Sequence, residues 1–218
     1  MPIQHKFYIN LLDDHERRQK FMGKGYHRWE AVSRDEVSDW LSDKMISYWN
    51  YPKKSHLGRC GCFASHMELY HYIVDNQLND VLILEDDAVL HKSLPKKYPK
   101  DGIIYLGGFF GNQKITNKEP VKINLKDGIN YLDPKYRIYM TMSYIIPTWQ
   151  IANEIIENVE FKQRYRAIDI MLGSMAIPKY FEYPGCFVEE GSKSTIATKD
   201  KKSNEYFRWV SNKKVTKI

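Results

Sequence analysis

The sequence predicts an α/β fold in which helices flank a central, mostly parallel sheet. Two continuous apolar runs of strand length, residues 81–84 and 102–108, have the composition of strands that are buried on both faces. Segments with a helical period, such as residues 60–77, alternate with the expected strands over the first half of the chain. Alternation of this kind is typical of βαβ units and of a parallel sheet. The 218 residues suit a single domain.

The elements of the first half follow from short local patterns. An apolar run at residues 6–12 predicts the first strand, and the charged cluster up to Arg18 begins a helix. The further elements expected are a strand at residues 28–32, a helix at residues 35–48 with Ser33 as its N-cap, a basic loop at residues 52–58, a helix at residues 60–77 and the buried strand at residues 81–84.

The second half continues with shorter elements. Residues 95–101 and 112–127 are polar and predict loops. The expected strands are residues 102–108, 137–146 and 180–188, and the expected helices are residues 148–159 and 169–175.

Charge is unevenly distributed along the chain. The net charge is +6, from 33 basic and 27 acidic residues, and much of the basic excess lies in the last quarter. We therefore divide the chain into one domain, residues 1–196, and a basic C-terminal tail, residues 197–218. A solvated tail and a peripheral contact with an anionic membrane surface both fit this charge. Nucleic-acid binding is not expected, because no arginine-rich helix or zinc-finger spacing accompanies the charge.

The cysteines and the N-terminal residues bear on the cellular compartment. The chain has three cysteines, Cys60, Cys62 and Cys186. An odd number and this spacing fit neither a disulfide framework nor a redox or zinc motif. They are interpreted as reduced, small packing residues. Residues 1–6 lack the apolar segment of a signal peptide, and no run approaches the roughly 18 apolar residues of a spanning helix. We accordingly expect a cytoplasmic protein that is peripheral to a membrane at most.

Three consecutive acids follow the buried strand at residues 81–84. Ligands of open α/β sheets bind outside the carboxyl ends of the strands, so Glu85, Asp86 and Asp87 lie where a ligand is expected. In an extended segment Glu85 and Asp87 point the same way, so both can face one cation while Asp86 turns aside. Carboxylate oxygens select Mg²⁺ or Mn²⁺, which often share their coordination with a substrate phosphate.

The acid run by itself leaves other interpretations open. Acids are common in a solvated turn between a strand and a loop. An ATPase would also place acids after an apolar strand, but the chain has no Gly-x-x-x-x-Gly-Lys-Ser/Thr loop. A two-metal nuclease would need further metal ligands, which the sequence does not identify.

Several segments, in a fixed order, carry a resemblance to one family. The most specific is Gly61-Cys62-Phe63-Ala64-Ser65-His66, followed at the right distance by residues 81–88. The others are Phe7-Tyr8-Ile9-Asn10-Leu11 with Arg17-Arg18, Ser143-Tyr144-Ile145-Ile146, Ile168-Asp169-Ile170, Tyr183-Pro184 and Ser194-Thr195-Ile196. Over about residues 7–196 the chain resembles family 25 glycosyltransferases, which include bacterial lipooligosaccharide galactosyltransferases and collagen galactosyltransferase domains. Leu12 and residues 112–127 depart from the family pattern.

The resemblance implies a fold, a reaction and a cofactor. The fold is GT-A-like and Rossmann-related, and the reaction moves a sugar, often galactose, from a UDP-sugar to a glycan or glycoconjugate acceptor with inversion. Such a reaction would belong to glycan or lipopolysaccharide biosynthesis. Glu85 and Asp87 look like the metal ligands, with Mn²⁺ or Mg²⁺ as the cofactor. Asp169 is the candidate base that takes the proton of the acceptor hydroxyl.

The same resemblance assigns the sugar donor to a set of polar residues. They are Asn10, Arg17, Ser65, His66, Glu85 and Asp86. Guanidinium groups pair well with phosphate oxygens, which suits Arg17 to the diphosphate. Structural alternatives remain open: a turn for Asn10, a solvated helix face for Arg17 and a core position for His66.

A second hypothesis comes from a different functional class. A non-catalytic relative of the same fold would bind a glycan or a partner glycosyltransferase without transferring a sugar. The sequence leaves the sugar, the acceptor, the linkage and the oligomeric state open.

Overall fold

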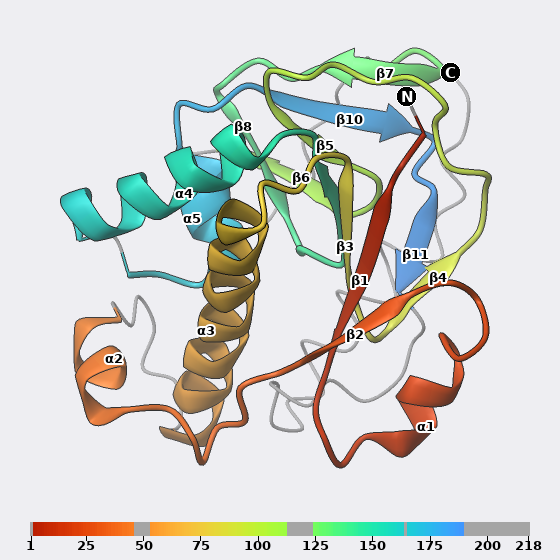
Figure 1. Ribbon diagram of the computed structural model, residues 1–218. Helices are drawn as coiled ribbons and strands as arrows, with labels where there is room; N and C mark the ends of the chain where they lie inside the picture. The colour runs from red at the N-terminus through yellow and green to blue at the C-terminus, as the bar shows by residue number, and fades with distance from the viewer. Residues whose placement is uncertain (1, 46–52, 113–123, 164, 190–218) are drawn as a thin grey trace.

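The computed structural model describes residues 2–45, 53–112, 124–163 and 165–189, and its centre is a seven-stranded sheet (Figure 1). In spatial order the sheet contains β2 (His27–Glu30), β1 (His5–Asn10), β3 (Val81–Glu85), β9 (Ser143–Ile146), β5 (Ile103–Tyr105), β10 (Lys179–Tyr183) and β7 (Gly128–Tyr131). Strands β9 and β7 run antiparallel to their neighbours, and the other strands share one direction. The prediction of a mostly parallel central sheet is confirmed.

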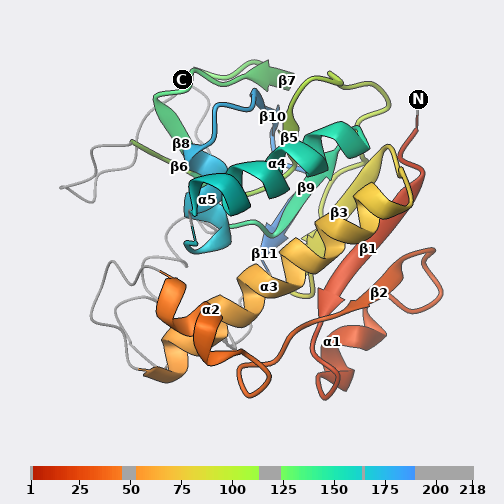
Figure 2. The ribbon, with the colours of Figure 1, turned by 60° about the vertical axis from the view of Figure 1, so that its left-hand side comes forward.

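Helices cover one face of this sheet. In Figures 1 and 2, α3 (Lys53–Asp75) and α4 (Trp149–Lys162) lie over the same face, with α5 (Ile168–Ser174) beside them. α3 contacts both of these helices and also α2 (Asp39–Lys44). The short helix α1 (His15–Gln19) follows β1. Two antiparallel ribbons complete the fold: β4 (Ala88–Leu90) pairs with β11 (Phe187–Glu189), and β6 (Phe109–Asn112) pairs with β8 (Tyr136–Tyr139).

The sheet separates two hydrophobic cores, and β3 contributes to both. Val81 and Ile83 face the core beneath α3, α4 and α5, whereas Leu82 and Leu84 face the core on the opposite side. All four side chains are fully buried. Successive side chains of a strand point to opposite faces, so a continuous apolar run is what a doubly covered strand requires. This burial confirms the prediction for residues 81–84.

Two helices differ from the sequence-based expectation at their N-termini. α3 begins at Lys53 and not near residue 60, so the basic segment that was predicted as a loop is its first turns. Long charged side chains lose little rotamer freedom in a helix, and charge alone therefore does not indicate a loop. α2 is capped by Ser38, whose Oγ accepts a hydrogen bond from the backbone N of Leu41 at 3.3 Å, and not by Ser33.

Two predicted strands are each divided in two. Residues 137–146 form parts of β8 and β9, and between them Met140 has a φ of +71°. Residues 180–188 form parts of β10 and β11. In each case one half stays in the central sheet and the other joins a ribbon. The position of such a break depends on the strand with which each half pairs. Local composition does not predict this long-range pairing.

Some predictions fall outside the described residues. These are the basic tail at residues 197–218, the segment Ser194-Thr195-Ile196 and most of the loop at residues 112–127. Within the described ranges, every helix is either too short or too polar to cross a membrane. Cys60, Cys62 and Cys186 are all free thiols.

Candidate functional site

A cavity of about 110 Å³ lies at the carboxyl ends of β1 and β3. From β1 the chain passes to β2 on one side, and it then returns across β1 to β3 on the other. Open α/β sheets bind their ligands where the strand order reverses in this way. The cavity is lined by most of the predicted site residues, namely Arg17, Ser65, His66, Glu85, Asp86 and Asp87.

The acid run bends at the end of β3. Glu85 is the last residue of the strand, and Asp86 and Asp87 form a turn before β4. The run is therefore not extended throughout, and alternation does not decide where Asp87 points. Glu85 and Asp87 are partly exposed and Asp86 is buried. The three acids thus have unequal environments.

Asp86 is paired through both of its carboxylate oxygens. Arg17 Nη1 donates to Oδ1 at 2.5 Å, and Asn10 Nδ2 donates to Oδ2 at 2.8 Å. Burial opposes the charge of Arg17, but the carboxylate of Asp86, with smaller contributions from two other aspartates, outweighs burial and raises the pKa of Arg17. Burial also raises the pKa of Asp86, against the effect of its two hydrogen bonds. This network ties the ends of β1 and β3 to α1.

Asn10 lies behind the cavity and not in its lining. Its Oδ1 accepts a hydrogen bond from Arg28 Nε at 3.3 Å, and its backbone oxygen accepts bonds from Arg28 Nη2 and from the backbone N of Ala31. With its Nδ2 bound to Asp86, the side chain links β1 to β2 and to the turn after β3. The assignment of Asn10 to the donor stays a prediction, and the contacts present in the structure support the shape of the site.

Glu85 has a more open environment than Asp86. Its Oε1 accepts a hydrogen bond from Thr141 Oγ1 at 2.5 Å and lies 3.8 Å from His66 Nε2. Burial works against ionisation, but His66, Thr141 and the charge of Arg17 together outweigh it and lower the pKa of Glu85. The side chain is therefore an ionised carboxylate at the cavity.

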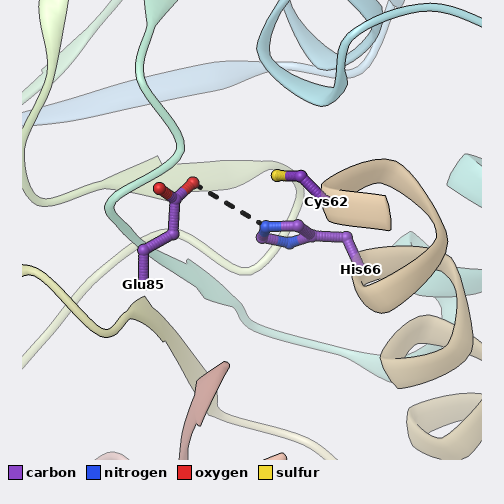
Figure 3. Close-up of side chains that lie close together, drawn as sticks. All are labelled: Cys62, His66 and Glu85. Atoms are coloured by element: carbon purple, nitrogen blue, oxygen red, sulfur yellow. Dashed lines mark ion pairs between the residues drawn. The ribbon is translucent and has the colours of Figure 1, made fainter. Parts of the chain in front are cut away.

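His66 is a fully buried residue of α3. Its Nδ1 lies 2.6 Å from Tyr144 Oη, which in turn lies 2.7 Å from Tyr70 Oη. The Tyr144 ring is stacked on the imidazole, with 5.8 Å between the ring centroids. Among the described residues His66 Nε2 has no hydrogen-bond partner, and it faces Glu85 (Figure 3). His66 therefore combines a core position with one ring nitrogen directed at the site.

The segment around Ser65 explains how α3 comes so close to the cavity. Ser65 Oγ donates to the backbone oxygen of Gly61 at 2.7 Å and accepts a bond from the backbone N of Val32 at 2.9 Å. A Cβ atom on Gly61 would lie 2.5 Å from the backbone oxygen of Val32, so only glycine allows this close approach. The hydroxyl proton of Ser65 is used within the protein, and donor binding by Ser65 stays a prediction.

Asp169 lies in the first turn of α5, outside the cavity lining. Its two oxygens accept hydrogen bonds from the backbone N atoms of Ile170 at 2.7 Å and Met140 at 3.4 Å. Burial raises the pKa of Asp169 despite these bonds, and the charge of Glu85 adds to the increase. Because Thr141 bonds to Glu85, two consecutive residues at the break after β8 connect the two acids.

Two cavity residues with a thiol or a charged side chain were not assigned to the site from the sequence. Cys62 was interpreted as a packing residue, but the residue is partly exposed and lines the cavity. The helical spacing of Cys62 and His66, four residues apart, places them on one face of α3 and was a usable signal. Arg34, in the loop after β2, also lines the cavity, and no local pattern indicates it.

The fold and the cavity define a class: an α/β protein with an acid-lined cavity at the carboxyl edge of a mixed sheet. The model of glycosyltransferase family 25, described as an LPS biosynthesis protein family, matches residues 3–172. The chain therefore belongs to glycosyltransferase family 25.

Individual relatives agree with this family. Procollagen galactosyltransferase 2 of Homo sapiens is 27% identical over an alignment of 170 positions, and the match covers 67% of this chain and 26% of that protein. A glycosyltransferase 25 family member of Anopheles gambiae is 26% identical over 67% of this chain and 27% of its own length. One from Drosophila pseudoobscura pseudoobscura is 33% identical over 40% of this chain and 16% of its own length. The match spans about a quarter of the length of the first two relatives.

Proposed function

We propose that this chain moves galactose or another hexose from a UDP-sugar to a glycan or glycoconjugate acceptor, with inversion at the anomeric carbon and with Mn²⁺ or Mg²⁺ as cofactor. The observation that carries the proposal is an acid-lined cavity at the point where the strand order reverses, in a family 25 chain. The name of the human relative, a procollagen galactosyltransferase, supports galactose as the sugar.

Glu85 and Asp87 fit a hard divalent cation. Both residues line the cavity and are partly exposed, whereas both oxygens of Asp86 are bound to Arg17 and Asn10. Carboxylate oxygens are the ligands that Mn²⁺ and Mg²⁺ prefer. When bound, such a cation would neutralise the charge that develops on the departing diphosphate.

Two positively charged side chains also lie at the cavity. Arg17 and Arg34 line it together with the acids. Arg17 is oriented by Asp86 and by Asp14, whose Oδ2 lies 3.5 Å from Arg17 Nε. A guanidinium that is already fixed loses little entropy when it binds phosphate oxygens. We assign the donor diphosphate to this side of the cavity.

Asp169 is the proposed base. In an inverting displacement, the acceptor hydroxyl loses its proton on the face of the sugar opposite the leaving group. A carboxyl whose pKa is raised by burial and by a neighbouring acid holds a proton more readily at neutral pH than an exposed one. The hydrogen bond from the backbone N of Met140 orients this carboxyl.

The test is a panel of UDP-sugars incubated with the protein in the presence of Mn²⁺, Mg²⁺ or a chelator. We expect donor hydrolysis with one UDP-sugar, and we expect the chelator to abolish it. Asp87→Asn should remove this activity, whereas Asp75→Asn, at an exposed position near the end of α3, should leave it unchanged. Binding of a glycan without turnover of any UDP-sugar would support the non-catalytic alternative. No response to any UDP-sugar would refute the transferase proposal.

A further inference from the structure

Three side chains with different donor atoms converge beside the cavity (Figure 3). Cys62 and His66 project from one side of α3, and Glu85 approaches from the end of β3. The thiol sulfur, an imidazole nitrogen and a carboxylate oxygen all lie within 4.8 Å of one another. Sulfur and imidazole nitrogen are not the ligands that Mg²⁺ or Mn²⁺ selects, but they are common ligands of Zn²⁺.

His66 is already arranged as a metal ligand. Its Nε2 is buried, lacks a hydrogen-bond partner among the described residues and lies 3.8 Å from Glu85 Oε1. Its Nδ1 is bound to Tyr144 Oη at 2.6 Å. When Nδ1 carries the ring proton, it donates to this oxygen and leaves the Nε2 lone pair directed at the site. Histidine ligands of metals usually have such a partner on the second ring nitrogen.

The surroundings favour a cation. Four carboxylates lie near the Cys62 thiol, those of Glu85, Asp169, Asp87 and Asp86. Their negative potential attracts a divalent ion, which would in turn stabilise the thiolate. Thr141 fixes the Glu85 carboxylate through its hydrogen bond to Oε1. Thr141 therefore orients Glu85 and Tyr144 orients His66, while the nearby carboxylates favour a cation beside Cys62.

We propose that Cys62, His66 and Glu85 form a three-ligand site for a divalent cation of the Zn²⁺ class. Tetrahedral zinc with these ligand types separates its ligand atoms by about 3.3–3.6 Å, given metal–ligand distances of about 2.0–2.3 Å. The observed separation of 3.8 Å between His66 Nε2 and Glu85 Oε1 is close to this value. All three residues line the cavity, so the fourth position would be open to water or to a ligand.

This site goes beyond the proposed transferase reaction, because its binding of Zn²⁺ requires no sugar donor. The two sites share Glu85, so a cation of the Zn²⁺ class would compete with the Mn²⁺ or Mg²⁺ of the transferase proposal. Only this consequence rests on the proposed function. Metal binding is tested separately from activity, and failure of one proposal is therefore distinguishable from failure of the other.

The experiment titrates untagged, metal-free protein with Co²⁺, which replaces Zn²⁺ and absorbs when it is bound to a thiolate. We expect one equivalent of Co²⁺ to produce a thiolate-to-metal charge-transfer band, and one equivalent of Zn²⁺ to remove it. Cys62→Ser should abolish the band and weaken Zn²⁺ binding by more than about 100-fold, since loss of a second-shell partner alone costs about 10- to 100-fold. Tyr144→Phe, which removes the partner of His66 Nδ1, should weaken Zn²⁺ binding by about 10- to 100-fold.

Cys186→Ser is the matched control, because Cys186 is a buried thiol whose hydrogen bond goes to the backbone oxygen of Ser93. This variant should keep both the band and the affinity of the wild type. Circular dichroism of each variant establishes that it is folded. The proposal is overturned if the wild type gives no charge-transfer band, or if the band survives in folded Cys62→Ser.

Discussion

The neighbouring acids Asp86 and Glu85 differ in their hydrogen-bond partners. On one side, Asp86 gives both oxygens to Arg17 and Asn10, and all three side chains are buried. On the other, Glu85 accepts a hydrogen bond from Thr141 and faces an imidazole nitrogen that has no partner among the described residues. Neighbouring acids of the same motif therefore have different environments: both oxygens of Asp86 are paired within the protein, whereas Glu85 is partly exposed at the cavity.

The difference has a geometric cause. Side chains alternate along β3, so Glu85 continues the face of Ile83, which packs beneath α3. Asp86 lies in the turn after β3 and bonds to Asn10, which continues the face of Tyr8 on β1. The helix α3 supplies the imidazole of His66 that faces Glu85, and α1 supplies the guanidinium of Arg17 that is paired with Asp86.

The largest expected effect on stability is at Asp86. Asp86→Ala would leave Arg17 buried without its main counter-ion, and loss of one partner of a buried pair costs about 3–5 kcal/mol. Asp87→Ala, at the partly exposed neighbour, should cost less than about 1 kcal/mol. Urea denaturation measures both. Equal losses for the two variants would show that Asp86 has no special structural role.

The next effect concerns activity at Glu85. Glu85→Gln keeps the shape of the side chain and removes its charge, so we expect donor hydrolysis to fall by about 10²- to 10³-fold. The free energy of unfolding should change by less than about 1 kcal/mol, because the side chain is partly exposed and its amide oxygen can still accept the bond from Thr141. A loss of stability as large as that of Asp86→Ala would remove the contrast between the two acids.

A smaller effect is expected at Tyr144. Tyr144→Phe deprives His66 Nδ1 and Tyr70 Oη of their shared partner in a fully buried position, which should cost about 1–3 kcal/mol. Tyr131→Phe is the control, because this tyrosine is exposed. Thermal or urea unfolding compares the two. If both variants match the wild type, the tyrosine pair does not stabilise the histidine side of the site.

The smallest effect concerns the pH dependence of stability at Asp169. Its pKa is raised in the folded state, so its contribution to stability is greatest below the unfolded pKa and is lost as the pH rises through the folded pKa. Relative to Asp169→Asn, the wild type should therefore become less stable between about pH 4 and neutral pH. Urea denaturation across this range measures the difference. A difference that does not change with pH would show that the carboxyl is not perturbed.

Local patterns predicted the main elements of the sheet and the place of the acids. Residues 81–84 were expected to be buried on both faces, and the structure confirms this. The later strands were less well predicted. The break at Met140 depends on β8 pairing with β6, which is a long-range choice, and it is this break that brings Thr141 to Glu85.

The sequence by itself determined the α/β class, the helix that carries Ser65 and His66, and the position of three acids at a strand end. Periodicity and spacing are properties of neighbouring residues, so they can be read along the chain. Only the tertiary structure decided which acid is paired and which is open. Arg17 and Asp86 are 69 residues apart, and His66 and Tyr144 are 78 apart. Contacts at such separations form only when the helices and strands pack together. The same packing places Cys62 in the cavity lining, although the sequence had suggested a packing residue.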